Sequence, residues 1–184
     1  MDMKQISRWG NLQRTLSLIL GGRWDAAGDL GTDIGRMVFS LDFWSPSQEE
    51  VQLTNVAGDK TLPTVTVAGI PAGATILRVV AMFKFRAVEN TNAAANKLNG
   101  AQDIQVRDDS PGAWADAINF VDDQFGVDAG PLREGGDVFI GSIDIKATVV
   151  GNDGYNFQWD EGVADLANLQ FNDLQVGLRV KFTV

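Results

Sequence analysis

The sequence predicts a mainly all-β protein, built as a two-sheet antiparallel sandwich of about eight strands with one short helix. The clearest observation is the last segment, 174–184, where apolar and polar residues alternate without a fault. A period of two residues is typical of a strand with one buried face and one wet face. Similar stretches recur along the chain, separated by turns rich in Gly, Pro, Asn and Asp. The length of 184 residues allows one substantial core.

The N-terminal segment, 1–35, is predicted to be an extended arm, and residues 36–184 are predicted to form the β-sandwich domain. Apolar residues of the arm recur at spacings of three and four, which is compatible with a short amphipathic helix, although 15–20 could equally form a strand. Five glycines between positions 21 and 35 interrupt regular structure. We therefore expect a loosely structured arm ahead of the sandwich.

The predicted strands follow one another through the rest of the chain. Pro71 and Gly73 predict a turn ahead of the long strand 75–88, because proline suits the first central position and glycine a positive φ. The first half of that strand is apolar on nearly both faces, which is common where one sheet packs under another. The strands are predicted over 36–44, 51–56, 64–67, 75–88, 104–106, 137–150, 155–159 and 166–184.

One helix is predicted near 111–121. Ser110 and Pro111 are typical of an N-cap and a first helical position. Trp114, Ile118 and Val121 follow at helical spacing. This segment is the single helix that we expect within the domain.

The charge of the chain indicates which partners it can bind. The formal net charge is −9, so nucleic acid is not expected as a partner. Residues 1–23 nevertheless carry four basic groups and one acidic group. A cationic arm on an anionic body suits head-to-tail contact between copies, although a short window can also show such a balance by chance. No stretch approaches the length of a membrane span, so no membrane partner is expected.

The residue types argue against catalysis. The chain has no cysteine and no histidine, which removes thiolate nucleophiles and the most usual general base. Adjacent carboxylates occur at 108–109, 122–123 and 160–161, but neighbours in a strand point apart. We predict that the chain is not an enzyme and that it has no cofactor and no catalytic or metal-binding residue. A structural calcium stays open as an alternative, and its candidate ligands are Asp122, Asp123 and Asp128, or Asn152 and Asp153.

Three aromatic residues, Tyr155, Phe157 and Trp159, share one face of a predicted strand. The expected hairpin 151–154 decides their environment. A loop with an even number of residues places the rings beside the polar side chains of 137–150, whereas a three-residue loop places them in the core. We favour the core, because three exposed rings in a row are costly without a partner. The alternative is a platform that stacks on sugar rings.

The run 70–76, which leads into a long strand, and the closing run 174–182 resemble accessory virion proteins of tailed bacteriophages, which are β-sandwich or jelly-roll decoration (cement) proteins. The resemblance covers about residues 64–184 and is one of style. It implies a jelly-roll-like fold and a non-enzymatic homo-oligomer. Such a protein binds capsid or other virion subunits and is assembled into the virion in the host cytoplasm. The arm would then reach a neighbour through Ile6, Arg8, Trp9, Arg14, Leu16 and Trp24.

Two other functions remain open at this point. A carbohydrate-binding or host-recognition module would use the aromatic face of Tyr155, Phe157 and Trp159. An enzyme acting through paired carboxylates is the weakest of the three hypotheses, because no second motif accompanies the carboxylates.

Overall fold

The computed structural model describes residues 38–53, 58–90, 102–109, 112–120, 132–161 and 169–183. The predicted arm, 1–35, lies outside these residues. The described chain is all-β and every strand pair in it is antiparallel. The strands are β1 (Val38–Trp44), β2 (Gln48–Gln52), β3 (Lys60–Thr66), β4 (Thr75–Lys84), β5 (Ala87–Asn90), β6 (Asp103–Asp108), β7 (Ala115–Asn119), β8 (Leu132–Glu134), β9 (Phe139–Ile140), β10 (Gly154–Asp160) and β11 (Leu169–Thr183).

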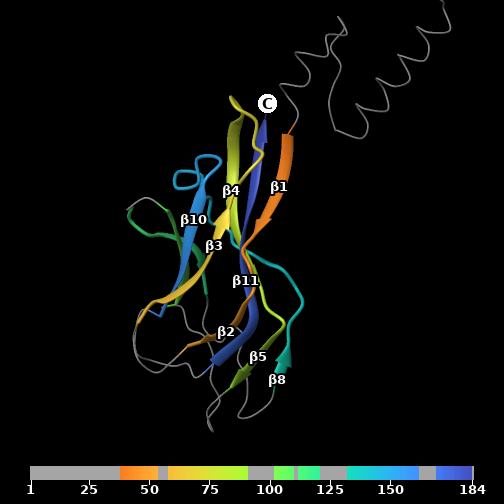
Figure 1. Cartoon of the computed structure of the whole chain (residues 1–184), viewed down its shortest axis with the longest axis vertical. Coiled ribbons are helices and arrows are strands. Elements are labelled where there is room, and N and C mark those ends of the chain that lie inside the picture. Colours follow the sequence, from red (N-terminus) through yellow and green to blue (C-terminus); the bar gives the residue numbers. More distant parts are fainter. Residues whose placement is uncertain are drawn as a thin grey trace, which may run out of the picture.

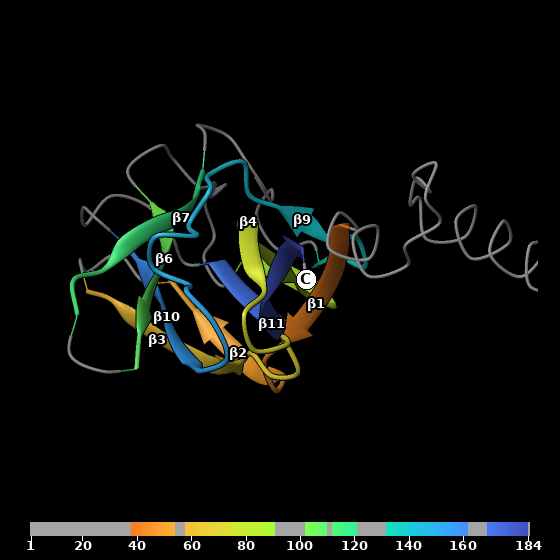
Figure 2. The same cartoon turned by 90° about the horizontal axis from the view of Figure 1, so that it is seen from above.

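The strands form two sheets, which confirms the predicted fold class. The larger sheet has seven strands in the order β8-β5-β11-β4-β9, and β1 and β2 also pair with β11. The smaller sheet has four strands in the order β3-β10-β6-β7. The two sheets lie beside each other along the long axis of the molecule (Figure 1), and the view from above separates β3, β6, β7 and β10 from β1, β4, β9 and β11 (Figure 2). The described fold is therefore a sandwich-like pair of sheets.

Strand β11 organises the larger sheet. Its second half pairs with β1 and β4, and its first half pairs with β2 and β5. The two halves meet at Asp173, a non-glycine residue with a positive φ of 53°. The partner strand is interrupted at the same level, because β4 ends at Lys84 and β5 begins at Ala87. The long strand predicted over 75–88 is thus two strands that follow the bend of β11.

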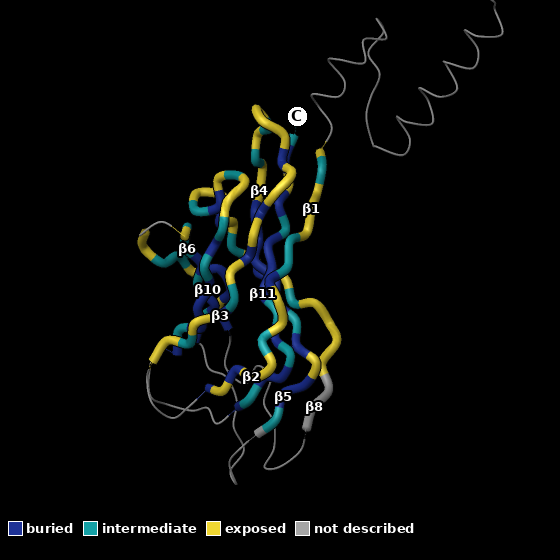
Figure 3. Tube along the Cα trace, in the orientation of Figure 1, coloured by how far each residue is buried: buried dark blue, intermediate teal, exposed yellow. Residues whose placement is uncertain are grey.

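The alternation along β11 sorts its side chains as predicted. Apolar residues from Leu174 to Phe182 are at most 3 % exposed, whereas Lys181 is exposed and Arg179 half-buried. Burial of the apolar face against the second sheet is the main source of stability in such a fold. Buried positions run along β10, β11 and the second half of β4 in Figure 3, and exposed positions lie in the loops, in β1 and in the first half of β4.

The turn predicted at 70–74 is confirmed. Gly73 has a φ of +84°, and the backbone N–H of Ala74 donates to the carbonyl oxygen of Pro71 at 3.1 Å. The side chain of Asn152 also braces this turn, because its amide oxygen accepts from the N–H of Ile70 at 2.9 Å and its amide nitrogen donates to the Ile70 carbonyl at 2.8 Å. The loop before β10 is therefore tied to the loop before β4.

The helix predicted near 111–121 is wrong, since the described part of this segment contains strand β7. The pair Ile118 and Ile104 joins β7 to β6, and Asn119 pairs with Asp103. Ile118 and Phe120 both lie in the core, with Asn119 exposed between them. The ring of Phe120 stacks on Trp159 at 4.9 Å. Long-range pairing and packing therefore override the local helical spacing.

The long strand predicted over 137–150 is also wrong, because only Phe139–Ile140 is a strand. The chain beyond Ile140 is not a strand but stays bonded to β4, since the N–H groups of Gly141 and Ile145 donate to the carbonyl oxygens of Ala81 and Val79 at 2.8 and 2.9 Å. At Gly141 an added Cβ would lie 2.6 Å from the carbonyl oxygen of Ala117 and 3.3 Å from that of Ala81. A side chain at this position would therefore clash with the backbone of β7. The predicted hairpin between 137–150 and 155–159 does not form, since β10 pairs with β3 and β6.

Candidate functional site

The outer face of the larger sheet gathers positive charge. Cross-strand partners share a face, so the pair Lys181 and Arg78 and the position of Arg179 opposite Val80 place three cations together on the side away from the core. Lys84, opposite Gln175, adds a fourth cation farther along β4. The carboxylate of Asp42, opposite Arg179 on β1, lies among these cations, and Glu50 and Glu89 lie on the outer face farther along β11, opposite Asn172 and Gln170. We call the group Arg78, Lys84, Arg179 and Lys181 the cationic face.

A shallow hollow lies within the cationic face. Its walls are Arg78, Val80, Ile140, Gly141, Arg179 and Lys181. The guanidinium of Arg78 donates to the carbonyl oxygen of Ser142 at 3.2 Å, which orients it along the rim. Asp144 stands at the border of the face. Burial alone raises the pKa of Asp144, but hydrogen bonds from the N–H groups of Val79 and Lys146 and the charges of Lys146 and Arg78 lower it overall.

Trp44 covers one end of the cationic face. Its ring lies over Gly177, where an added Cβ would be 2.7 Å from the indole. The ammonium group of Lys84 lies 4.4 Å from the centre of the same ring, which is a cation–π contact. Glycine at position 177 therefore lets an aromatic ring lie flat on the sheet beside the positive charges.

The outer face of the smaller sheet carries the opposite charge. Asp103 and Asp160 are cross-strand partners, and Gln105 is opposite Asp116. The side-chain amide of Gln105 donates to Asp116 and to Asp160, each at 3.1 Å. We call the group Asp103, Asp116 and Asp160 the acidic face. Its described strands bring one cation, Arg107, to the same side, with the guanidinium 4.4 Å from the ring of Trp114.

Asp103, a member of the acidic face, has a raised pKa. Burial, together with the neighbouring charges of Asp116 and Asp160, raises the pKa of Asp103 to about 6. The negative charge of this face therefore grows as the pH rises through that value. Since the two sheets pack core to core, the cationic face and the acidic face point to opposite sides of the sandwich.

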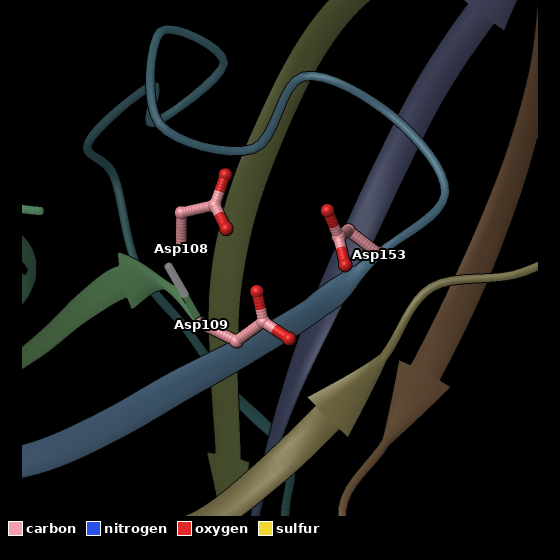
Figure 4. Close-up of side chains that lie close together, drawn as sticks. All are labelled: Asp108, Asp109 and Asp153. Atoms are coloured by element: carbon pink, nitrogen blue, oxygen red, sulfur yellow. The ribbon is translucent and has the colours of Figure 1, made fainter. Parts of the chain in front are cut away.

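A third charged group lies at the end of β6. Carboxylate oxygens of Asp108, Asp109 and Asp153 all lie within 4.8 Å of one another (Figure 4). Pairing of β6 with β10 brings them together, because the N–H of Asp109 donates to the Gly154 carbonyl at 3.1 Å. Carboxylate oxygens are suitable ligands for calcium. Asp109 and Asp153 are exposed, and Asp153 already accepts a hydrogen bond from the N–H of Gly154 at 2.8 Å. We assign no metal to this group.

The calcium ligands considered from the sequence do not form one site. Asp122, Asp123 and Asp128 lie outside the described residues. The amide group of Asn152 is occupied by the backbone of Ile70. Only Asp153 of the second set joins the acidic trio.

Tyr155, Phe157 and Trp159 lie in the core, as favoured from the sequence, and the alternative of an aromatic platform is wrong. Each of the three side chains is 0 % exposed. The hydroxyl of Tyr155 donates to the Gly151 carbonyl at 2.9 Å and accepts from the N–H of Gly151 at 3.2 Å. These rings cannot stack on a sugar while the sandwich is folded. The residues proposed for carbohydrate binding are therefore buried and cannot contact a ligand.

The remaining predicted site residues, Ile6, Arg8, Trp9, Arg14, Leu16 and Trp24, lie outside the described residues.

Comparison of the chain with protein families, with curated proteins and with solved structures finds no match. Within the described ranges, the structure contains no helix of the length and apolar character that crossing a membrane requires.

The two charged faces were not predicted from the sequence. The alternation of Arg179 and Lys181 with apolar residues places them on the wet side of their strand, and the same pattern holds for Lys84. Which strands lie beside each other decides whether such charges gather or scatter. That information is long-range, so no local signal reveals it.

Proposed function

We propose that this chain is a non-enzymatic structural protein of a virion, of the kind that decorates or cements the capsid of a tailed bacteriophage. The observation that carries the proposal is the charge separation across the sandwich: a cluster of four cations lies on one outer face and a cluster of three carboxylates on the other. A subunit with oppositely charged sides is suited to lie between neighbours that carry complementary surfaces. Charged contacts of this kind set register and partner choice more than affinity.

The cationic face is the surface that we assign to a shell subunit. Three of its members, Arg78, Arg179 and Lys181, surround one hollow, so an acidic side chain or chain terminus of a neighbour would meet several cations at once. Arg78 and Lys181 are exposed, whereas Arg179 is half-buried and engaged with Asp42. Arm residues of the segment 1–35 would add apolar contacts to the same assembly.

The amino-acid composition supports a role without catalysis. The lack of histidine and cysteine removes the groups that most often carry proton transfer and nucleophilic attack near neutral pH. The clustered carboxylates of the acidic face are tied by Gln105, which uses its amide group to bridge two of them. An acid–base pair of carboxylates would need one of them to face a substrate pocket.

The proposal is tested first by the genes beside the coding sequence. We expect capsid, portal or tail genes, and the shell protein that they encode is then the probe. Purified chain is mixed with shells of that protein and sedimented through a sucrose gradient. We expect co-sedimentation at a fixed ratio, weakened by Lys181→Glu and unchanged by Lys146→Glu, an equal charge change outside the cationic face.

Two results would overturn the proposal. One is a gene neighbourhood without virion components. The other is a folded chain that stays at the top of the gradient with shells in excess. Binding that responds equally to Lys181→Glu and Lys146→Glu would remove the assignment of the cationic face.

A further inference from the structure

Strand β1 differs from the other edge strands of the described fold. Each edge strand has one hydrogen-bonded neighbour, and natural sheets usually protect such edges with short length, charge, proline or a bulge. β8 and β9 are three and two residues long. The longer edges carry protective residues: Glu49 and Glu50 in β2, Lys60 and Pro63 in β3, and Asp116 in β7.

None of these devices protects β1. Its seven residues contain no proline, glycine or lysine, and its register with β11 runs unbroken from Val38 to Trp44. Its single charge, Asp42, is neutralised by Arg179. Apolar side chains are accessible at this edge, since Val38 is 56 % exposed and Leu41 38 % exposed. Figure 1 shows β1 beside β11 at the margin of the larger sheet.

The backbone of β1 presents alternate residues to its open side. The N–H of Ser45 donates to the Val176 carbonyl of β11 at 2.9 Å. Backbone groups of a strand alternate in direction, so the odd-numbered residues Phe39, Leu41 and Phe43 also face β11. The even-numbered residues of β1 turn their N–H and C=O groups to the open edge. Among the described strands, none pairs with that edge.

We propose that β1 is a self-association edge that pairs antiparallel with β1 of a second copy, on a two-fold axis at Leu41. This register pairs Leu41 with Leu41 of the second copy, Phe39 with Phe43, Ser40 with Asp42 and Val38 with Trp44. Every hydrogen-bonding pair in it joins two even-numbered residues, whose backbone groups face the open edge. All seven residues of β1 pair with the second copy in this register, and about eight backbone hydrogen bonds form between the two β1 strands.

The side chains match in this register. On the core side, Phe39 and Phe43 are half-buried and meet each other across the axis, with Leu41 between them. On the outer side, the hydroxyl of Ser40 can donate to Asp42. A register centred on Asp42 would place two carboxylates opposite each other, which is unfavourable. The axis at Leu41 avoids that contact.

The dimer has a consequence for the outer surface. A two-fold axis perpendicular to an antiparallel pair keeps the same face of both sheets on one side. The two cationic faces would then form one continuous surface. The inference does not rest on the virion function, because dimerisation is a property of the chain alone.

A cysteine cross-link tests the register directly, since the chain has no cysteine of its own. Leu41 and its symmetry mate form a non-hydrogen-bonded pair with Cα atoms about 4.5 Å apart, which is within the range of a disulfide. We expect mild oxidation of Leu41→Cys in the full chain to give a reducible dimer. The matched control is Leu77→Cys, at a residue that is 40 % exposed and lies outside β1. It should remain largely monomeric.

Light scattering without a cross-link provides the second measurement. We expect the unmodified chain to reach about twice its mass of 19.9 kDa as concentration rises. Leu41→Lys places two like charges on the axis, and Ser40→Pro removes an N–H that faces the open edge without disturbing the bonds to β11. Each should weaken the dimer at least about tenfold. Near-ultraviolet circular dichroism checks that both variants stay folded.

The outcomes are distinct. A chain that stays monomeric at every concentration, with no cross-link from Leu41→Cys, would overturn the proposal, and this includes an edge covered by another part of the same chain. A dimer that persists unchanged in both folded variants would place the interface elsewhere. Failure to bind shells has no bearing on either result.

Discussion

The guanidinium of Arg179 on β11 holds the carboxylate of Asp42 on β1 through two parallel hydrogen bonds, each 2.7 Å long. The two residues are direct cross-strand partners, so the pair ties the exposed edge strand to the central strand of the sheet. It also neutralises the single charge of β1. One ion pair therefore stabilises the cationic face and leaves the edge of β1 without net charge.

Asp42→Asn should lower the free energy of unfolding at pH 7 by less than about 1 kcal/mol, because both side chains remain about a third exposed. The hydrogen bonds from Arg179 lower the pKa of Asp42. A lowered pKa means that the stabilisation is complete above the unfolded value of about 3.9 and is lost as the pH falls through the folded value. Urea denaturation at pH 7 and at pH 2 measures this, at a fixed low protein concentration. A difference that persisted at low pH would contradict the ion pair as its cause.

Asp103→Asn should stabilise the protein at pH 8. Burial raises the pKa of Asp103 to about 6, so the folded state binds this proton more tightly than the unfolded state. The charged form is therefore a cost, which is absent below about pH 4, grows between about pH 4 and 6, and is complete above that range. Because the group is partly solvated, we expect a gain of about 1 kcal/mol after screening. Equal stability of the two proteins at every pH would contradict the raised pKa.

Gly177→Ala should destabilise the protein by about 1–3 kcal/mol, since the new methyl group would lie 2.7 Å from both the Trp44 ring and the Phe43 carbonyl oxygen. Displacement of Trp44 should also change its fluorescence. The matched control is Gly151→Ala, where an added Cβ meets no atom within 4 Å. That variant should stay within about 0.5 kcal/mol of the parent. Equal effects at the two positions would show that Trp44 does not lie over Gly177.

Trp159→Ala should destabilise the protein by about 3–5 kcal/mol. The indole is 0 % exposed and contacts Phe120 and Phe171, with ring centres 4.9 and 5.0 Å away. Trp114→Ala is the control, because Trp114 is half-buried and lies at the surface beneath Arg107. We expect the control to cost about 1 kcal/mol or less. Thermal unfolding compares the two variants. A Trp159→Ala variant as stable as the parent would contradict the burial of Trp159 in the core.

The charged faces show why the candidate site was harder to predict than the fold. Arg78 and Lys181 are more than one hundred positions apart in the chain and become neighbours only through the register of β4 and β11. A slip of one residue would turn one of them toward the core. The acidic face depends in the same way on the pairing of β6 with β7 and β10.

The amino-acid order alone establishes which residues of β11 are buried, where the turn at Gly73 lies, and that the fold is all-β. These properties depend on neighbours one to four positions away, and alternation or a glycine is sufficient to encode them. Which strands pair with each other depends on long-range contacts in the folded chain. The segment around Ile118 became a strand because it pairs with β6 and packs Phe120 on Trp159. The segment 141–150 is not a strand, and Gly141 packs closely against the carbonyl oxygen of Ala117. Burial of apolar surface between distant segments outweighs local preference, so the final assignment of these segments depends on the assembled core.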